Sequence, residues 1–175
     1  DPFGAVISKL SGTGAGAMTK NRLAGNGTNA APVEGPGLNS PLTYGYMGTS
    51  MDTAGNYYFT LNWQLYKLTQ AQNMVHIGPA GWNSNVIFDS EGDGKKHFIG
   101  VVGETLQYLA LNASDDSIAV SYTALCLPGT TLINARQISK ANDGNLLISD
   151  TMNNRVLKYY IRDTNGQIAL TTNCP

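Results

Sequence analysis

Charged residues are scarce in this chain: they make up 13% of its 175 positions, and the formal net charge is −1. Eleven Lys and Arg against twelve Asp and Glu supply no basic excess, which argues against nucleic acid as a partner. The sequence also lacks an apolar run long enough to cross a bilayer, so we expect no membrane span. The polar surface must come from Asn, Thr, Ser, Gln and Gly instead.

Helical periodicity is also missing, whereas alternation of apolar and polar residues at period two is common. Twenty glycines and dense turn pairs, such as Asp93-Gly94 and Asp143-Gly144, suit short strands joined by tight turns. The sequence therefore predicts an all-β fold.

One motif recurs: a polar turn, an Asn, three apolar or aromatic residues and a small hydroxyl residue. It is clear in residues 52–60 and 142–149, and a degenerate copy occupies residues 89–100. The copies recur roughly every 40 to 50 residues, a period typical of stacked four-stranded units. The chain is expected to be one domain built of such units.

Alignment of the copies predicts a half unit followed by three whole units. The predicted strands are residues 5–10 and 18–23; 44–51, 56–61, 64–69 and 74–77; 85–88, 96–101, 105–111 and 118–124; and 133–140, 145–149, 155–162 and 167–172. The corresponding segments are a half unit at 1–24, a connector at 25–41, and whole units at 42–81, 82–129 and 130–175. The connector is so rich in Gly and Pro that we expect it to supply no strand.

Several fragments resemble the NHL repeat: Leu23-Ala-Gly-Asn-Gly-Thr28, Leu38-Asn-Ser-Pro41, Asp52-Thr-Ala-Gly-Asn-Tyr-Tyr58 and Ile148-Ser-Asp-Thr-Met-Asn-Asn-Arg155. The middle unit departs from the pattern, because Gly103-Glu-Thr105 stands where the family has an Asn-x-Arg turn. The resemblance implies a β-propeller with about three and a half four-stranded blades in this chain, the first strand of each blade nearest the axis. The resemblance does not specify one function, because NHL propellers mostly bind proteins, RNA or glycans and are only occasionally enzymes.

Two turns between the second and third strands of a unit are candidate binding sites. They carry Asn62 and Trp63 in the first whole unit, and Asn153, Asn154 and Arg155 in the last. A propeller would place both on one rim, where Trp and Arg are good interface anchors. The alternative is that residues 153–155 only close a hairpin.

Asp89, Glu91 and Asp93 precede Gly94 at alternate positions, like the first half of a calcium loop. The twelfth position of such a loop would be Gly100 rather than an acid, and the register matches turns in the other units. A plain turn is therefore the favoured interpretation, with a calcium site as the alternative.

His76 and His97 are the only histidines, too few to recreate the zinc site of NHL-like amidating lyases. The predicted axis-lining strands offer one acid, Asp89, which also argues against chemistry on the axis. We expect no cofactor. The alternative is a metal-dependent lyase or hydrolase of the NHL kind, with its site on the propeller axis.

Two glycosylation sequons, Asn26-Gly-Thr28 and Asn112-Ala-Ser114, and the low Lys and Glu content favour an extracellular, secreted or surface location. The sequence starts at Asp1 without Met, so we expect a processed or trimmed piece with any export signal out of view.

Cys126 and Cys174 end equivalent strands one unit apart, a separation normally beyond the roughly 4.4–6.8 Å between Cα atoms that a disulfide allows. Because Cys174 is the penultimate residue, we nevertheless expect an intrachain bond, worth roughly 4 kcal/mol through loop closure. A bond to another chain is the alternative.

The half unit lacks its two inner strands, so the backbone of residues 6–10 should present an unpaired edge. Strands from the rest of a longer propeller, or from a second copy, could pair with it. The sequence thus predicts a non-catalytic extracellular module for protein or glycan interaction and structural assembly. It would polymerise by strand addition into a ring or filament, or belong to a larger propeller.

Overall fold

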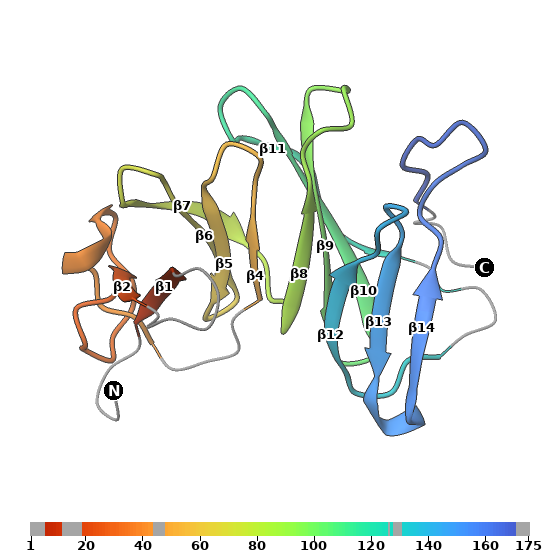
Figure 1. The fold of residues 1–175 in the computed structure, drawn as a ribbon, viewed down its shortest axis with the longest axis horizontal. Helices are drawn as coiled ribbons and strands as arrows, with labels where there is room; N and C mark the ends of the chain where they lie inside the picture. Colours follow the sequence, from red (N-terminus) through yellow and green to blue (C-terminus); the bar gives the residue numbers. More distant parts are fainter. Residues whose placement is uncertain (1–5, 12–18, 44–47, 126, 128–130, 171–175) are drawn as a thin grey trace.

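The computed structural model describes residues 6–11, 19–43, 48–125, 127 and 131–170, and these form an all-β fold (Figure 1). Their strands are arranged in four antiparallel sheets, named A to D here in chain order. Two single-turn 3-10 helices, η1 (Gly37–Asn39) and η2 (Thr151–Asn153), complete the elements. No helix in this part of the chain is long and apolar enough to span a membrane.

The strands follow the chain from sheet to sheet. Sheet A holds β1 (Ile7–Ser11) and β2 (Thr19–Ala24); sheet B holds β3 (Gly35–Pro36), β4 (Thr49–Met51), β5 (Tyr57–Leu61), β6 (Gln64–Leu68) and β7 (Asn73–Pro79); sheet C holds β8 (Ser84–Phe88), β9 (Lys95–Val102), β10 (Thr105–Asn112) and β11 (Ile118–Leu125); sheet D holds β12 (Ala135–Lys140), β13 (Leu146–Asp150) and β14 (Arg155–Tyr159). The order across sheet B is β3-β7-β6-β5-β4, and the order across sheet C is β11-β10-β9-β8.

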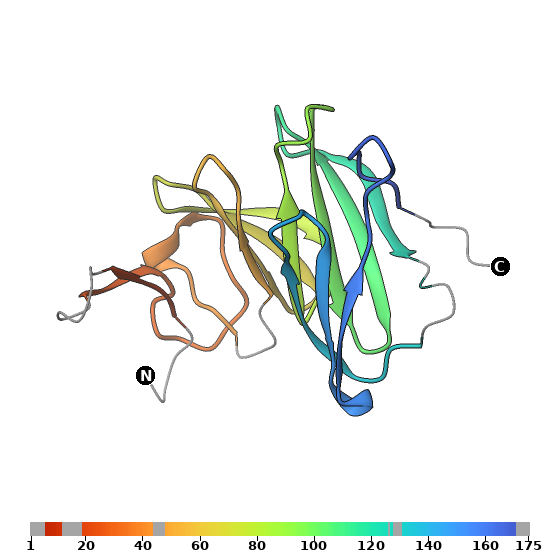
Figure 2. The ribbon, with the colours of Figure 1, turned by 45° about the vertical axis from the view of Figure 1, so that its right-hand side comes forward.

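The sheets lie side by side in chain order, and an apolar core fills each space between neighbours (Figures 1 and 2). Alternation along β5 shows why: Tyr58 packs in the core toward sheet C, whereas the next residue, Phe59, packs in the core toward sheet A. The first strands of successive units, β4, β8 and β12, contact one another in turn. Each of the inner sheets is therefore buried on both faces.

Most of the predicted strands are confirmed, and those predicted at residues 5–10 and 18–23 correspond to β1 and β2, which form a two-stranded sheet. The first predicted strand of sheet B is shorter than expected within the described residues, since β4 begins at Thr49 and residues 44–47 lie outside them. The predicted last strand, residues 167–172, is present only as an isolated bridge between Arg162 and Ile168, and residues 171–175 are outside the description. A tight turn at residues 163–167 folds this segment back.

The connector is the clearest error of the sequence-based prediction, because it does supply a strand. Gly35 and Pro36 form β3 and pair with β7 at the outer edge of sheet B. The Gly37 amide donates to the carbonyl of Gln72, and a Cβ at Gly37 would lie 2.8 Å from the Leu68 side chain, so the close approach requires glycine. The connector thus covers β7 and leaves β1 uncovered.

Within the described residues the four sheets are open and do not close into a ring. Sheet A has two strands, and β1 pairs with β2 alone. At the opposite end of the row, β14 is the last strand of sheet D. Within the described residues, the sheets at the two ends of the row thus have a neighbouring sheet on one face only.

Candidate interaction sites

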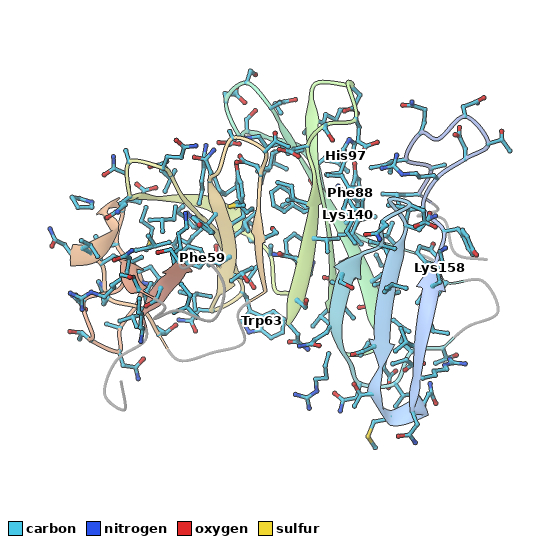
Figure 3. The ribbon with its side chains drawn as sticks, in the orientation of Figure 1. Phe59, Trp63, Phe88, His97, Lys140 and Lys158 are labelled. Atoms are coloured by element: carbon cyan, nitrogen blue, oxygen red, sulfur yellow. The ribbon has the colours of Figure 1, made fainter. Side chains whose placement is uncertain are left out.

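Trp63 is exposed on a strained turn. Asn62 and Trp63 join β5 to β6 with left-handed backbones, at φ 49° and 60°. Two-residue hairpins of this kind prefer Asn-Gly, and a bulky residue with positive φ is rare. The indole lies against Gly81, where an added Cβ would come within 1.7 Å of the ring, yet 68% of Trp63 remains exposed (Figure 3). The turn thus holds an aromatic side chain in a fixed orientation at the surface.

The second predicted turn, at residues 153–155, is stabilised by a buried carboxylate. Asp150 is fully buried at the end of β13, and its carboxylate accepts hydrogen bonds from Arg155 Nε at 2.8 Å and Asn153 Nδ2 at 2.7 Å. The Ile133 amide donates to the other oxygen at 2.7 Å. Burial raises the pKa of Asp150, but these hydrogen bonds outweigh it and the pKa is lowered. Arg155 and Asn153 therefore stabilise the hairpin, and a binding role for this turn stays a prediction.

Both turns lie at the same edge of the molecule, the lower edge in Figures 1 and 3. Asn154 takes the left-handed conformation that ends η2. Of the five predicted binding residues, Trp63 alone combines a bulky side chain with a largely exposed surface and no structural carboxylate beneath it. Sequence reasoning missed Asp150, although its place in the family-like fragment before the Asn-Asn-Arg turn could have suggested it.

The three acids of the predicted calcium loop contact three different parts of the molecule. Asp89 Oδ2 accepts hydrogen bonds from the amide and hydroxyl of Thr53 in sheet B, at 2.6 and 2.8 Å. Glu91 forms a bidentate ion pair with Arg162, at 2.7 and 2.9 Å. Asp93 contacts His97 Nε2 at 3.1 Å. No group of three or more His, Cys, Asp or Glu suited to a metal ion occurs among the described residues.

Each histidine has a partner. His97 is buried, and its Nδ1 lies 2.8 Å from the hydroxyl of Tyr108. Burial and the charge of Asp93 raise the pKa of Tyr108 to about 12. His76 Nε2 lies 2.8 Å from Gln64 Oε1. The two histidines thus lie in separate environments, each beside a polar partner.

A polar network between sheets B and C escaped the sequence analysis. Asp116, on the turn from β10 to β11, accepts hydrogen bonds from Lys67 Nζ and Lys96 Nζ, both at 2.6 Å. The hydroxyl of Tyr58 lies 3.1 Å from Asp116 and receives a hydrogen bond from Lys96 at 2.9 Å. Asp52, whose side chain is 1% exposed, lies 3.6 Å from Lys96. Only long-range pairing brings these residues together, so no local pattern could reveal them.

The pKa shifts of this network indicate structural ion pairing. Burial, together with the charges of Asp116 and Asp52, raises the pKa of Tyr58 far above its usual range. Burial also raises the pKa of Asp116, but the hydrogen bonds from Lys67 and Lys96 outweigh it and lower the pKa. A tyrosine held neutral beside two paired lysines is poorly suited to acid–base work at neutral pH.

A groove runs beside the open strand of sheet A. It has a volume of about 460 Å³ and lies between sheet A and sheet B. Its lining consists of Lys9, Leu23, Met51, Gly55, Tyr57, Leu68, Thr69, Gln70 and Gln72. Met51 is 55% exposed there, and Lys9 on β1 is exposed as well. On the side of sheet A it is lined by Lys9 of β1 and Leu23 of β2, so it runs along the face of sheet A that is turned toward sheet B.

The two sequons lie in turns. Asn26 is exposed, its Nδ2 donates to the carbonyl of Asn39, and its Oδ1 accepts from the Thr28 amide. Asn112 is half-buried at the end of β10, and its Nδ2 donates to the hydroxyl of Ser117. The use of either sequon remains a prediction. The predicted disulfide partners, Cys126 and Cys174, lie outside the described residues.

The chain was compared with protein families and with curated proteins. The resemblance to the NHL repeat stays a prediction from the quoted sequence fragments. A scan against protein-family models finds no match for the chain, and a search of curated proteins finds none either.

Proposed function

We propose that this chain is a non-catalytic extracellular β-propeller module, built of NHL-like four-stranded blades, that serves protein or glycan interaction and structural assembly. Sheets B and C would be whole blades, sheet A the outer half of a blade, and sheet D a blade with its last strand incomplete. The contact of β4, β8 and β12 in turn supports this arrangement, since a propeller gathers the first strands of its blades around one axis.

The observation that carries the proposal is that both ends of the row of sheets are open. Elsewhere in the molecule, every face between neighbouring sheets holds an apolar core. The far face of sheet D instead exposes Leu147 at 36% and Val156 at 68%, and Tyr160 beyond β14 is 68% exposed. A shallow hollow of about 310 Å³ beside Leu147 and Val156 marks the same face. Such a face is suited to receive a further sheet.

Trp63 is the residue we propose for contact with a separate protein or glycan ligand. Its exposed indole at a rim turn has the properties of an interface anchor. Arg155, in contrast, is engaged in an ion pair with Asp150.

Light scattering on the purified chain tests the assembly role. We expect association above the monomer mass, and we expect Leu147→Glu together with Val156→Glu to reduce it, because two charges would be buried at the interface. A matched control is Thr105→Glu, a charge added at an exposed position of sheet C. Association that is absent in the native chain, or that the sheet D variant leaves unchanged, would contradict the proposal.

A further inference from the structure

We infer that the open edge of β1 and the groove beside it bind an acidic, extended peptide by β-strand addition. The inference rests on the proposed role as an interaction module and specifies the chemistry of one partner. It concerns the end of the molecule opposite to sheet D.

The edge of β1 is available for pairing. Along Ile7–Ser11 the strand pairs with β2 on one side, and the described residues provide no strand on the other. The backbone N–H and C=O groups of that second side are a template for an added strand. The connector does not pair with them, because its strand β3 pairs with β7.

The groove supplies a place for the side chains of the added strand. A strand beside β1 would direct alternate side chains toward sheet B, where the exposed Met51 and, from β2, the half-buried Leu23 offer apolar surface. Lys9 contributes the one charge of the groove lining. The volume of about 460 Å³ suits a few side chains rather than a folded domain.

The local charge decides the kind of peptide. Residues 6–33 contain three cations, Lys9, Lys20 and Arg22, and no Asp or Glu. All three cations are exposed, and none takes part in the ion pairs found among the described residues. Net positive charge beside an open strand favours an acidic partner.

Positive charge is present on both faces of sheet A. Arg22 and Lys20 stand opposite Ser8 and Leu10 across the β1–β2 pair, whereas Lys9 stands opposite Asn21. Because residues paired across antiparallel strands share a face, Lys20 and Arg22 lie on the face away from Lys9. Lys9 is therefore the cation next to an added strand, whereas Lys20 and Arg22 lie one strand further away on the opposite face.

A second copy of this chain fits the edge less well. Its free strand at the other end, β14, carries Arg155 and Lys158, which would face the cations of sheet A. The outermost strand of sheet C, β11, carries no charge at all. The inference therefore assigns the acidic strand to another protein.

Fluorescence anisotropy with a labelled peptide of alternating Glu and Val tests the inference on the full chain. We expect saturable binding that weakens as salt is added, because exposed charge pairs are screened. Two control peptides should fail: one with Lys in place of Glu, and one with Pro at alternate positions, which lacks the backbone N–H groups for pairing. Lys9→Glu should weaken binding of the Glu peptide about tenfold. The matched variant Lys158→Glu, on a strand far from the groove, should not.

Equal binding of the Glu and Lys peptides, or an unaffected Lys9→Glu variant, would overturn the inference. So would a native chain that ignores the acidic peptide, since Lys9 would then be a charge that merely keeps other strands off the edge. A chain that associates in light scattering but ignores the peptide contradicts this inference alone. Thermal melting of each variant, monitored by circular dichroism, establishes that it is folded.

Discussion

At the scale of single residues, some buried polar side chains have hydrogen-bond partners among the described residues and others do not. Asn145 is buried, and its Oδ1 accepts a hydrogen bond from the Ile161 amide. Asn85 is 3% exposed in β8, and neither atom of its amide has a partner among the described residues. A buried polar group without a partner costs about 1–3 kcal/mol, so the two asparagines should differ in their effect on stability.

We expect Asn85→Leu to increase the free energy of unfolding by about 1 kcal/mol, because it removes an unsatisfied amide from the space between sheets B and C. Asn145→Leu is the matched control and should lower stability by about 1–3 kcal/mol, since the Ile161 amide would be left unpaired. Urea denaturation measures both. A loss of stability in Asn85→Leu would mean that a buried water satisfies the amide.

The strained turn gives a second prediction at this scale. Replacing Trp63 by Gly creates the Asn-Gly pair that the backbone conformation prefers. Since the side chain is 68% exposed, little burial is lost, and we expect a gain of about 0.5–1 kcal/mol in denaturant unfolding. Asn154→Gly is the control: Asn already tolerates the left-handed conformation, so its gain should be smaller. If Trp63→Gly is instead destabilising, packing against Gly81 is worth more than the strain.

At the scale of elements, the sequence predicts strands well and their polar contacts poorly. Period-two alternation and turn pairs placed β9 and β10 within one residue at each end, because both signals are local. The two-residue strand β3 was missed because Gly and Pro are poor strand residues by composition. The pairing of β3 with β7 uses backbone groups, so it does not depend on the side chains of Gly35 and Pro36. The Asp116 network was missed because its five members lie on five different segments.

The turn from β10 to β11 is the element that this network makes sensitive to acid. Asp116 has a lowered pKa, so its contribution to stability is complete above the unfolded value of about 3.9. That contribution is lost as the pH falls through the lower folded pKa. Asp116→Asn keeps the shape and the left-handed turn but leaves Lys67 and Lys96 without their carboxylate.

We therefore expect Asp116→Asn to lower the free energy of unfolding by about 1–3 kcal/mol at neutral pH. The difference from the native chain should shrink as the pH is lowered below about 4. Urea denaturation over a pH series measures this, with Glu104→Gln, an exposed acid in the β9–β10 turn of the same sheet, as the control. A difference that is independent of pH would show that the carboxylate charge is not what stabilises the turn.

At the scale of the whole molecule, stability depends on what covers the two ends of the stack. Sheets B and C have cores on both faces, but sheets A and D have a core on one face only. A two-stranded sheet such as sheet A is marginally stable alone, and the three strands of sheet D are the fewest that can be stable independently. The sheets at the two ends should therefore open first and most easily, and any partner that covers them should stabilise the chain.

The isolated 18.6 kDa chain should accordingly not behave as a lone closed monomer. If copies cover one another's open ends, association stabilises the folded state by mass action, and the melting temperature should rise with protein concentration. Scanning calorimetry over a concentration series measures this, and light scattering at the same concentrations gives the mass. The Leu147→Glu and Val156→Glu double variant is the control, and its melting temperature should be lower and independent of concentration. A native chain that melts cooperatively as a monomer, at one temperature for every concentration, would show that the open faces need no partner.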